Sequence, residues 1–167
     1  MVGSQFSGVL NSNIWPYYES RARLKFELND LDGAVADMDK AIQINPKGDH
    51  LYRVRSKFYI LQKKDDKALA DLNKSIACQD KDQESTYRCR GDLYLRLKKY
   101  DLAVKDYTAA INCSAKKKDD RSMELDYSGR AKAYEKLGKM DLAAADRKKV
   151  QAVVKDGWGA FLYEDGK

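Results

Sequence analysis

Residues 87–110, YRCRGDLYLRLKKYDLAVKDYTAA, contain a pattern that occurs four times along the chain. The pattern opens with a tyrosine, two variable residues, an arginine and a small residue, as in Tyr87-x-x-Arg90-Gly91, and an alanine stands twelve residues after the small residue. Self-similarity at a fixed period of about 20 to 50 residues is typical of repeat proteins. The other copies begin with Tyr18-x-x-Arg21-Ala22, Tyr52-x-x-Arg55-Ser56 and Tyr127-x-x-Arg130-Ala131, and the four alanines, Ala34, Ala68, Ala103 and Ala143, are 34, 35 and 40 residues apart.

The spacing within one repeat predicts two helices joined by a short polar turn. In the third repeat Tyr87 and Tyr94 recur at helical spacing, and Lys98-Lys99 interrupts the pattern. Asp101 stands at the start of the second helix, where its carboxylate can accept hydrogen bonds from unpaired N–H groups and complement the helix dipole. The second helix then carries small and large apolar residues on one face: Ala103, Tyr107, Ala110 and Ile111.

The composition of the whole chain agrees with a helical protein. The 167 residues are 35% charged and 43% apolar, with a net charge of +6, only two prolines and ten glycines. This length suits one domain or two small ones. No run of about 20 apolar residues could span a bilayer, so membrane insertion is not expected. The apolar share is still sufficient to build a core.

The repeated residues resemble the tetratricopeptide-repeat (TPR) family over roughly residues 15–155. The resemblance implies an all-α, right-handed α-solenoid of about four helix–turn–helix repeats and eight helices. We place the repeats at about 15–48, 49–82, 84–117 and 124–157. Lys25, Gln62 and Arg147 depart from the family pattern in the first, second and fourth repeats. In the third repeat the pattern of aromatic, small, aromatic, alanine, large and small residues is Tyr87, Gly91, Tyr94, Ala103, Tyr107 and Ala110.

Each repeat also carries an arginine on the first helix and an aspartate on the second. We predict that these residues form a ladder of partly buried ion pairs between packed helices. Such pairs fix geometry more reliably than they add stability. The expected pairs are Arg21 with Asp37, Arg55 with Asp71, Arg90 with Asp106, and Arg130 with Asp146.

By the same resemblance, the first helices line a concave groove with more basic than acidic side chains. The expected function is a non-catalytic scaffold that binds a partner protein or peptide there. An acidic or C-terminal-carboxylate peptide is the expected ligand, since opposite potentials speed encounter and fix register; the alternative is that these are ordinary solvated side chains. The predicted partner-binding residues are Arg23, Arg53, Lys57, Arg88, Asp92, Arg96, Lys132 and Lys136.

Three other interactions concern the groove and the ends of the repeat array. TPR domains that grip chaperone tails use a clamp of Lys, Asn and Arg residues, and neither register of this sequence keeps that set. Binding of single-stranded RNA is an alternative permitted by the basic charge, but a regular series of exposed aromatic residues for base stacking is missing from the groove positions. Self-assembly is a further alternative: we expect a monomer, or a weak homo-oligomer formed through the C-terminal end.

Catalytic, metal and cofactor sites are not expected. His50 is the only histidine and has no evident catalytic partners, and no Gly-rich phosphate loop occurs. Cys78, Cys89 and Cys113 have no Cys-x-x-Cys spacing, so neither a disulfide framework nor a thiolate zinc site is predicted. Cys89, beside Arg88 at a groove position, is the one candidate for a reactive thiol.

The segments outside the repeats are less regular. Residues 1–14 are expected to be a flexible leader, whose first four residues are consistent with a cloning remnant. Residues 112–124, with the basic run 116–118, are expected to form a solvated loop or an extended helix end, and the alternative is a nuclear-localisation signal or a nucleic-acid contact. Residues 156–167 form a tail in which Trp158, Phe161 and Leu162 are expected to cap the last helix. A cytoplasmic location is expected, with a removed signal segment as the alternative.

Overall fold

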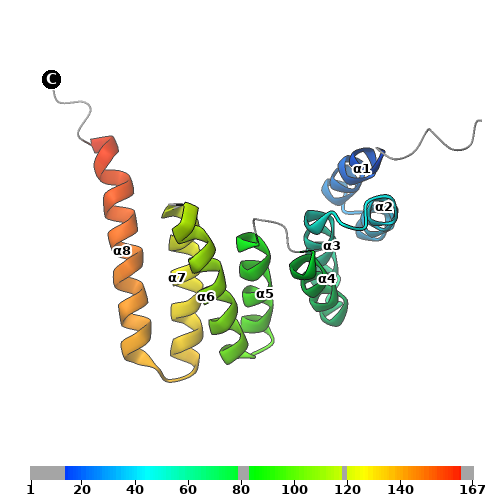
Figure 1. Ribbon diagram of the computed structural model, residues 1–167. Coiled ribbons are helices and arrows are strands. Elements are labelled where there is room, and N and C mark those ends of the chain that lie inside the picture. Colours follow the sequence, from blue (N-terminus) through cyan, green and yellow to red (C-terminus); the bar gives the residue numbers. More distant parts are fainter. Residues whose placement is uncertain (1–13, 79–82, 118–119, 163–167) are drawn as a thin grey trace, which may run out of the picture. The chain divides into compact units, whose positions relative to one another are not determined.

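The computed structural model describes residues 14–78, 83–117 and 120–162, with the main chain alone for residues 117, 120 and 153–162. Over these residues the chain forms eight α-helices and no strand. They divide into two compact units, residues 1–80 and 81–167. The all-α class and the helix–turn–helix pairs expected from the sequence are confirmed (Figure 1).

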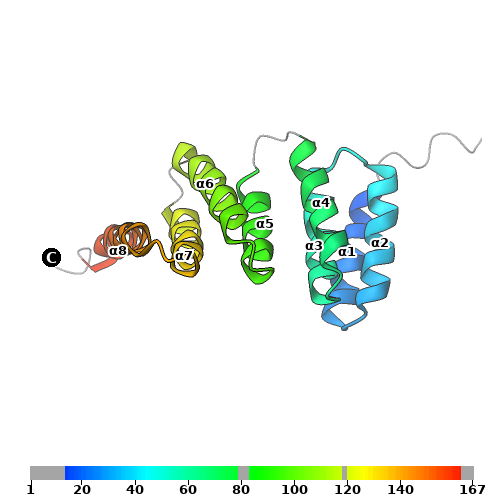
Figure 2. The same ribbon diagram turned by 90° about the horizontal axis from the view of Figure 1, so that it is seen from below.

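The helices of each unit follow one another as antiparallel neighbours. In the first unit α2 packs on α1 and on α3, and α4 packs on α3; in the second unit α6 packs on α5 and on α7, and α8 packs on α7 (Figure 2). The first unit contains α1 (Trp15–Glu27), α2 (Leu31–Ile44), α3 (Asp49–Leu61) and α4 (Asp65–Ala77). The second contains α5 (Glu84–Arg96), α6 (Tyr100–Lys117), α7 (Asp120–Lys136) and α8 (Met140–Leu162).

The surplus residues of the third repeat lengthen helices. α6 continues to Lys117, and α7 begins at Asp120, four residues before the expected start at Glu124. Of the two expectations for this region, the extended helix end is correct. At the other end of the unit, the main chain of α8 is helical to Leu162. The expected capping by Trp158, Phe161 and Leu162 concerns side chains outside the described residues, as do the leader before Ile14 and the last residues of the tail.

Each helix pair is closed by the same tight turn. One residue of every turn has a left-handed backbone: Asn29 (φ 62°), Lys63 (φ 58°), Lys98 (φ 59°) and Gly138 (φ 73°). The aspartates expected to cap the second helices lie instead in their first turns, where they complement the helix dipole, as Asp32 does in α2. In α2 the capping side chain is Asp30, which accepts a hydrogen bond from the Gly33 N–H at 2.8 Å.

Small residues bring the helices of a pair close together. In the first unit Ala22, Ala34 and Ala41 are fully buried around Met38, and in the second Ala103 and Ala133 pack around Tyr107. A methyl group at these positions lets two helix backbones approach, and the large side chains fill the space between turns. The alanines of the repeat pattern are therefore core residues.

The predicted ladder of ion pairs is present in all four repeats. Each arginine donates two hydrogen bonds from Nε and Nη2 to the two carboxylate oxygens of its aspartate, in the bidentate geometry that suits a guanidinium. Each guanidinium also lies over two tyrosine rings, as Arg90 does with Tyr87 and Tyr94. The bonds of Arg21–Asp37, Arg55–Asp71, Arg90–Asp106 and Arg130–Asp146 are all between 2.6 and 2.8 Å long.

None of the helices in the described part of the chain combines the length and the apolar character that crossing a membrane requires.

Candidate functional site

A basic pocket of about 440 Å³ lies between α1 and α3 of the first unit. Arg23, Arg53 and Lys57, three of the residues predicted for partner binding, line it together. Phe26 and Phe58 supply apolar surface beside them, with their rings stacked at a centroid distance of 5.4 Å. The pocket therefore combines positive charge with an aromatic wall.

A second basic pocket, of about 580 Å³, lies in the second unit. Arg96 on α5 and Lys132 and Lys136 on α7 line it with Asp92, so four more predicted residues meet in one place. Lys98 adds a further cation from the turn after α5. The remaining lining residues are Leu95, Tyr100 and Glu135.

Five cations that line the two pockets differ from the arginines of the ladder in one respect; Arg23 is not among them, because it donates to Glu19 at 2.7 Å. Every ladder arginine donates to a carboxylate, as Arg55 does to Asp71. Within the described residues, by contrast, no ion pair or side-chain hydrogen bond is made by the pocket residues Arg53, Lys57, Lys98, Lys132 and Lys136. Acids also line the pockets, namely Glu27 in the first and Asp92 and Glu135 in the second, and the charge of Lys132 opposes the burial that raises the pKa of Asp92.

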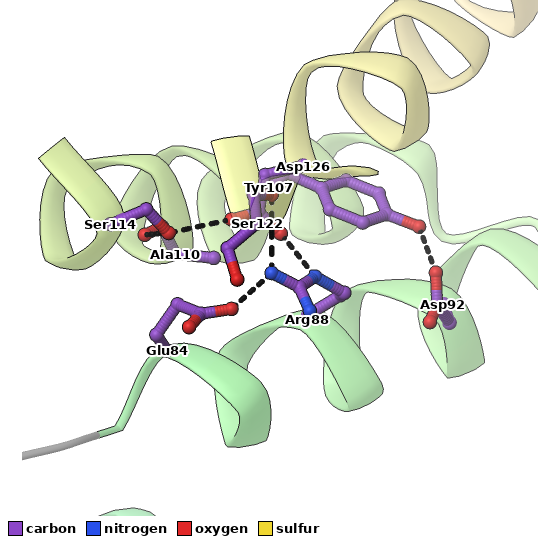
Figure 3. A network of polar contacts seen from close by, with 8 residues as sticks. All are labelled: Glu84, Arg88, Asp92, Tyr107, Ala110, Ser114, Ser122 and Asp126. Carbon is purple, nitrogen blue, oxygen red and sulfur yellow. Dashed lines mark hydrogen bonds and ion pairs between the residues drawn. The ribbon is translucent and has the colours of Figure 1, made fainter. Parts of the chain in front are cut away.

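Arg88, by contrast, is paired with acids, and the structure does not place it among the exposed cations of the groove as predicted. It lies mostly buried between α5 and α7 (Figure 3), where its Nε donates to Asp126 Oδ1 at 2.6 Å. Its Nη2 donates to Glu84 and, at 3.2 Å, to the main-chain oxygen of Ser122. The reason is Asp126, a fully buried carboxylate that also accepts a hydrogen bond from the Ser114 hydroxyl at 3.2 Å.

Burial and pairing act in opposite directions within this cluster. Burial raises the pKa of Asp126, and the hydrogen bond from Arg88 opposes that shift. Burial likewise disfavours the charge of Arg88, but the hydrogen bond to Asp126 and the charges of Asp126 and Glu84 leave the pKa of Arg88 raised. The guanidinium therefore stays charged and is held by groups inside the unit.

Tyr107 connects this interior to the second pocket. Its ring passes close to two glycines, and a Cβ atom added to Gly129 would lie 2.4 Å from the ring, against 3.2 Å for Gly91. Its hydroxyl donates a hydrogen bond to Asp92 Oδ1 at 2.6 Å, as Figure 3 shows. Burial, and next the hydrogen bond to Asp92, raise the pKa of Tyr107. The orientation of the Asp92 carboxylate in the pocket is thus set by a residue of α6.

Several pocket residues were missed by sequence reasoning. Phe26 lies on α1 close to the predicted Arg23, and its 42% exposure is unusual for a phenylalanine. Lys98 and Tyr100 belong to the turn and the start of α6, which pattern matching treats as a break. Helical spacing could have found Phe26, three residues after Arg23. No spacing rule would have found Lys98 and Tyr100.

The remaining candidates carry less chemistry. A third pocket, of about 320 Å³ between α7 and α8, contains Arg147, which pairs with Glu135. The three cysteines are half-buried and form no disulfide bond with one another. In the part of the chain that the structure describes, no group of three or more His, Cys, Asp or Glu residues is placed to hold a metal ion.

Comparisons with known proteins agree on one family. The tetratricopeptide-repeat family model matches residues 16–47 and 90–116. No curated protein sequence shows significant similarity to this chain.

Solved structures show the fold over most of the chain. A crystal structure of MamA has a TM-score of 0.75 at 18% identity, covering 87% of this chain and 81% of that one. BtubC from P. vanneervenii has a TM-score of 0.83 at 14% identity, covering 93% and 69%. The first TPR of Spaghetti (RPAP3), bound to the HSP90 peptide SRMEEVD, has a TM-score of 0.61 at 22% identity, covering 83% and 99%.

Four repeats in register, the paired helices and the family match lead to the same conclusion: this chain contains tetratricopeptide repeats, which the family model matches at residues 16–47 and 90–116.

Proposed function

We propose that this protein is a non-catalytic interaction scaffold that binds an acidic segment of a partner protein at its two basic pockets. The observation that carries the proposal is the set of cations without an acid partner, Arg53 and Lys57 in the first pocket and Lys98, Lys132 and Lys136 in the second. Elsewhere in the chain, arginines are neutralised by carboxylates. Unpaired cations around a concave surface attract an anionic ligand and fix its register.

The nature of the ligand is supported by the apolar surface in each pocket and by one structural neighbour. Phe26 beside Arg53 suits a segment in which a large apolar side chain stands next to acids. The peptide SRMEEVD held by the RPAP3 domain has three acidic residues and one basic residue. Because the clamp residues of chaperone-tail binders are not kept here, we propose an acidic partner of a different sequence.

The test is co-purification of partners from the native lysate, identified by mass spectrometry after nuclease treatment. Wild type is compared with Arg53→Glu/Lys57→Glu and with Lys132→Glu/Lys136→Glu. We expect the same protein partner to be lost or strongly reduced in both pocket variants. Titration calorimetry with the acidic segment of that partner, and with a copy in which its acids are amides, then measures the electrostatic part of binding.

Lys74→Glu/Lys105→Glu is the matched control, because these two exposed lysines lie on the second helices α4 and α6, away from the pockets. It changes the net charge by the same amount as each pocket variant. Partners retained by both pocket variants, or lost equally in the control, would show that the pockets are not the binding surface.

A further inference from the structure

The outer face of α1 exposes an apolar stripe. Tyr17, Leu24 and Leu28 lie at helical spacing along it and are 59%, 59% and 81% exposed. No element among the described residues covers them. Apolar residues scattered singly are ordinary on a protein surface, whereas apolar side chains gathered on one face of a helix are typical of an interaction site.

The corresponding face is covered in α3 and α7, the two first helices that have a preceding helix in their own unit. One repeat later, Leu51 and Phe58 of α3 stand at the positions of Tyr17 and Leu24 and are 0% and 5% exposed, in the core that α3 shares with α1 and α2. In α7 the corresponding residues are Asp126 and Ala133, both fully buried under α6. The face of α1 thus has the form of a surface on which a helix packs.

The ladder arginines show the same difference in their polar contacts. Arg55 Nη1 donates to Asp39 Oδ1 on the preceding α2 at 2.5 Å, and Arg130 Nη1 donates to Thr108 Oγ1 on the preceding α6 at 2.9 Å. In α1 the Nη1 group of Arg21 donates only to the hydroxyl of Tyr17, at 3.3 Å. The Arg21 side chain is 36% exposed, against 17% for Arg55 and 16% for Arg130.

We propose that the outer face of α1 binds an amphipathic α-helix of a partner polypeptide. This helix lays apolar side chains on Tyr17, Leu24 and Leu28, and it presents a carboxylate or hydroxyl oxygen to Nη1 of Arg21. The contacts of α2 with α3 and of α6 with α7 are the templates for the apolar contact and for the oxygen that faces the guanidinium. This surface is separate from the basic pockets, so the proposal does not depend on the proposed function.

A second copy of this chain does not fit as the occupant through α8. This last helix of the second unit carries Arg147 and Lys148 at the positions of Met38 and Asp39. Arg147 is 62% exposed. Placing these two cations against Arg21 would set like charges opposite one another, which disfavours association.

The residues before Ile14 fit less well in the register of the repeat. Counted in the 34-residue register, Ser4 and Gly8 would take the places of Met38 and Ile42, the large apolar residues with which α2 packs in the core. In that register the segment offers little apolar surface at the positions that cover Leu24 and Leu28. We therefore assign the occupant to another polypeptide, and deletion of residues 1–13 tests that assignment.

The probe for the test is the α2 sequence itself, residues 31–45, held helical by a lactam between Lys40 and a glutamate introduced as Ala36→Glu. Both positions are exposed in α2. We expect its addition to the full chain to shift the backbone amide signals of Tyr17, Leu24 and Leu28 in NMR spectra. A second peptide with Asp39→Lys should bind at least about tenfold more weakly, because it replaces the oxygen that faces the guanidinium with a cation.

Variants of the chain then locate the site. Leu24→Asp/Leu28→Asp should weaken binding of the probe by about tenfold or more, since it introduces charge on the apolar stripe. Leu102→Asp, at an exposed leucine of α6, is the matched control and should leave the affinity unchanged. Arg53→Glu/Lys57→Glu should also leave it unchanged, which separates this face from the first pocket.

Four outcomes would overturn the proposal. The first is equal binding of the two peptides, or no binding by a probe shown to be helical. The second is amide shifts confined to Leu51 and Phe58, which would mean that the probe displaces α2. The third is a dimer in analytical ultracentrifugation that Leu24→Asp/Leu28→Asp dissociates, which would assign the face to a second copy. The last is about tenfold stronger binding after deletion of residues 1–13, which would assign it to the chain's own leader.

Discussion

At the scale of single residues, an arginine held by an aspartate and two tyrosines is the recurrent unit of this protein. The two hydrogen bonds of Arg21 lower the pKa of Asp37 to about 2, against the opposing effect of burial. In each repeat the carboxylate is nearly inaccessible to water and is neutralised by its arginine, and in the first repeat Asp37 also pairs with Lys25 at 3.0 Å. Where the arginine is the paired cation, its removal leaves a buried charge without a partner, which costs more than the pair contributes.

Arg90→Ala should therefore lower the free energy of unfolding by about 3 kcal/mol, because Asp106 stays buried and charged. For a chain of this size that corresponds to a fall in melting temperature of roughly 8 °C, measured by circular dichroism. Lys105→Ala, at an exposed position on α6, is the control and should change stability by less than about 0.5 kcal/mol. Equal melting temperatures for the two variants would contradict a structural role for the ladder.

At the scale of the helix pair, the turn between the two helices fixes their antiparallel packing. Asn29, Lys63, Lys98 and Gly138 occupy the same left-handed position of the four turns. An L-residue other than asparagine or aspartate is disfavoured there, since its Cβ approaches the following carbonyl oxygen. Lys63 and Lys98 adopt this disfavoured conformation because the packing of the two helices fixes the geometry of the turn.

Lys63→Gly should stabilise the first unit by up to about 1 kcal/mol, because glycine adopts φ 58° without steric cost. Lys64→Gly is the matched control: Lys64 is the N-cap of α4 with φ −93°, so glycine is accepted there but relieves no backbone strain, and we expect a change of less than about 0.5 kcal/mol. Urea unfolding at constant m-value compares the two variants. Equal changes of stability in the two variants would show that the left-handed turn carries no strain.

At the scale of the whole molecule, the net charge of +6 raises the question of nucleic-acid binding. The cations of the two pockets favour any polyanion. Base recognition needs stacking surfaces as well, which contribute about 1–3 kcal/mol per base. Among the described pocket residues the aromatic side chains are Phe26, Phe58 and Tyr100, and Phe58 is buried. The pockets therefore offer charge with little stacking.

We expect single-stranded RNA to bind weakly and without sequence preference. Labelled oligouridylate and oligoadenylate should have equal affinities by fluorescence anisotropy. Both should lose roughly a hundredfold in affinity between about 50 and 200 mM salt, because the interaction is counterion release alone. An acidic partner segment should displace either RNA. Tight binding of one RNA sequence that survives 200 mM salt and resists the acidic segment would instead favour an RNA-binding function.

The sequence by itself determined the repeat and everything that follows from its period. Alanines and tyrosines spaced along each pair of helices can be buried only if the pairs pack as they do, and each ladder arginine meets an aspartate sixteen residues later within one repeat. The repeat and the ladder are local relations, set by contacts inside a single helix pair. Helical spacing also puts Arg53, Lys57, Lys132 and Lys136 on one side of α3 and α7, where they line the two pockets, and their role in partner binding stays a prediction.

Only the tertiary structure decided what lies beyond one repeat. Arg88 turns inward because Asp126, thirty-eight residues later, occupies the buried position that Leu51 fills in the second repeat. Tyr107 reaches Asp92 because glycine stands at position 129 of the next first helix. The exposure of Tyr17, Leu24 and Leu28 follows from the absence of a covering helix among the described residues. In each case the role of a side chain depends on the neighbouring repeat, which the pattern of its own repeat does not specify.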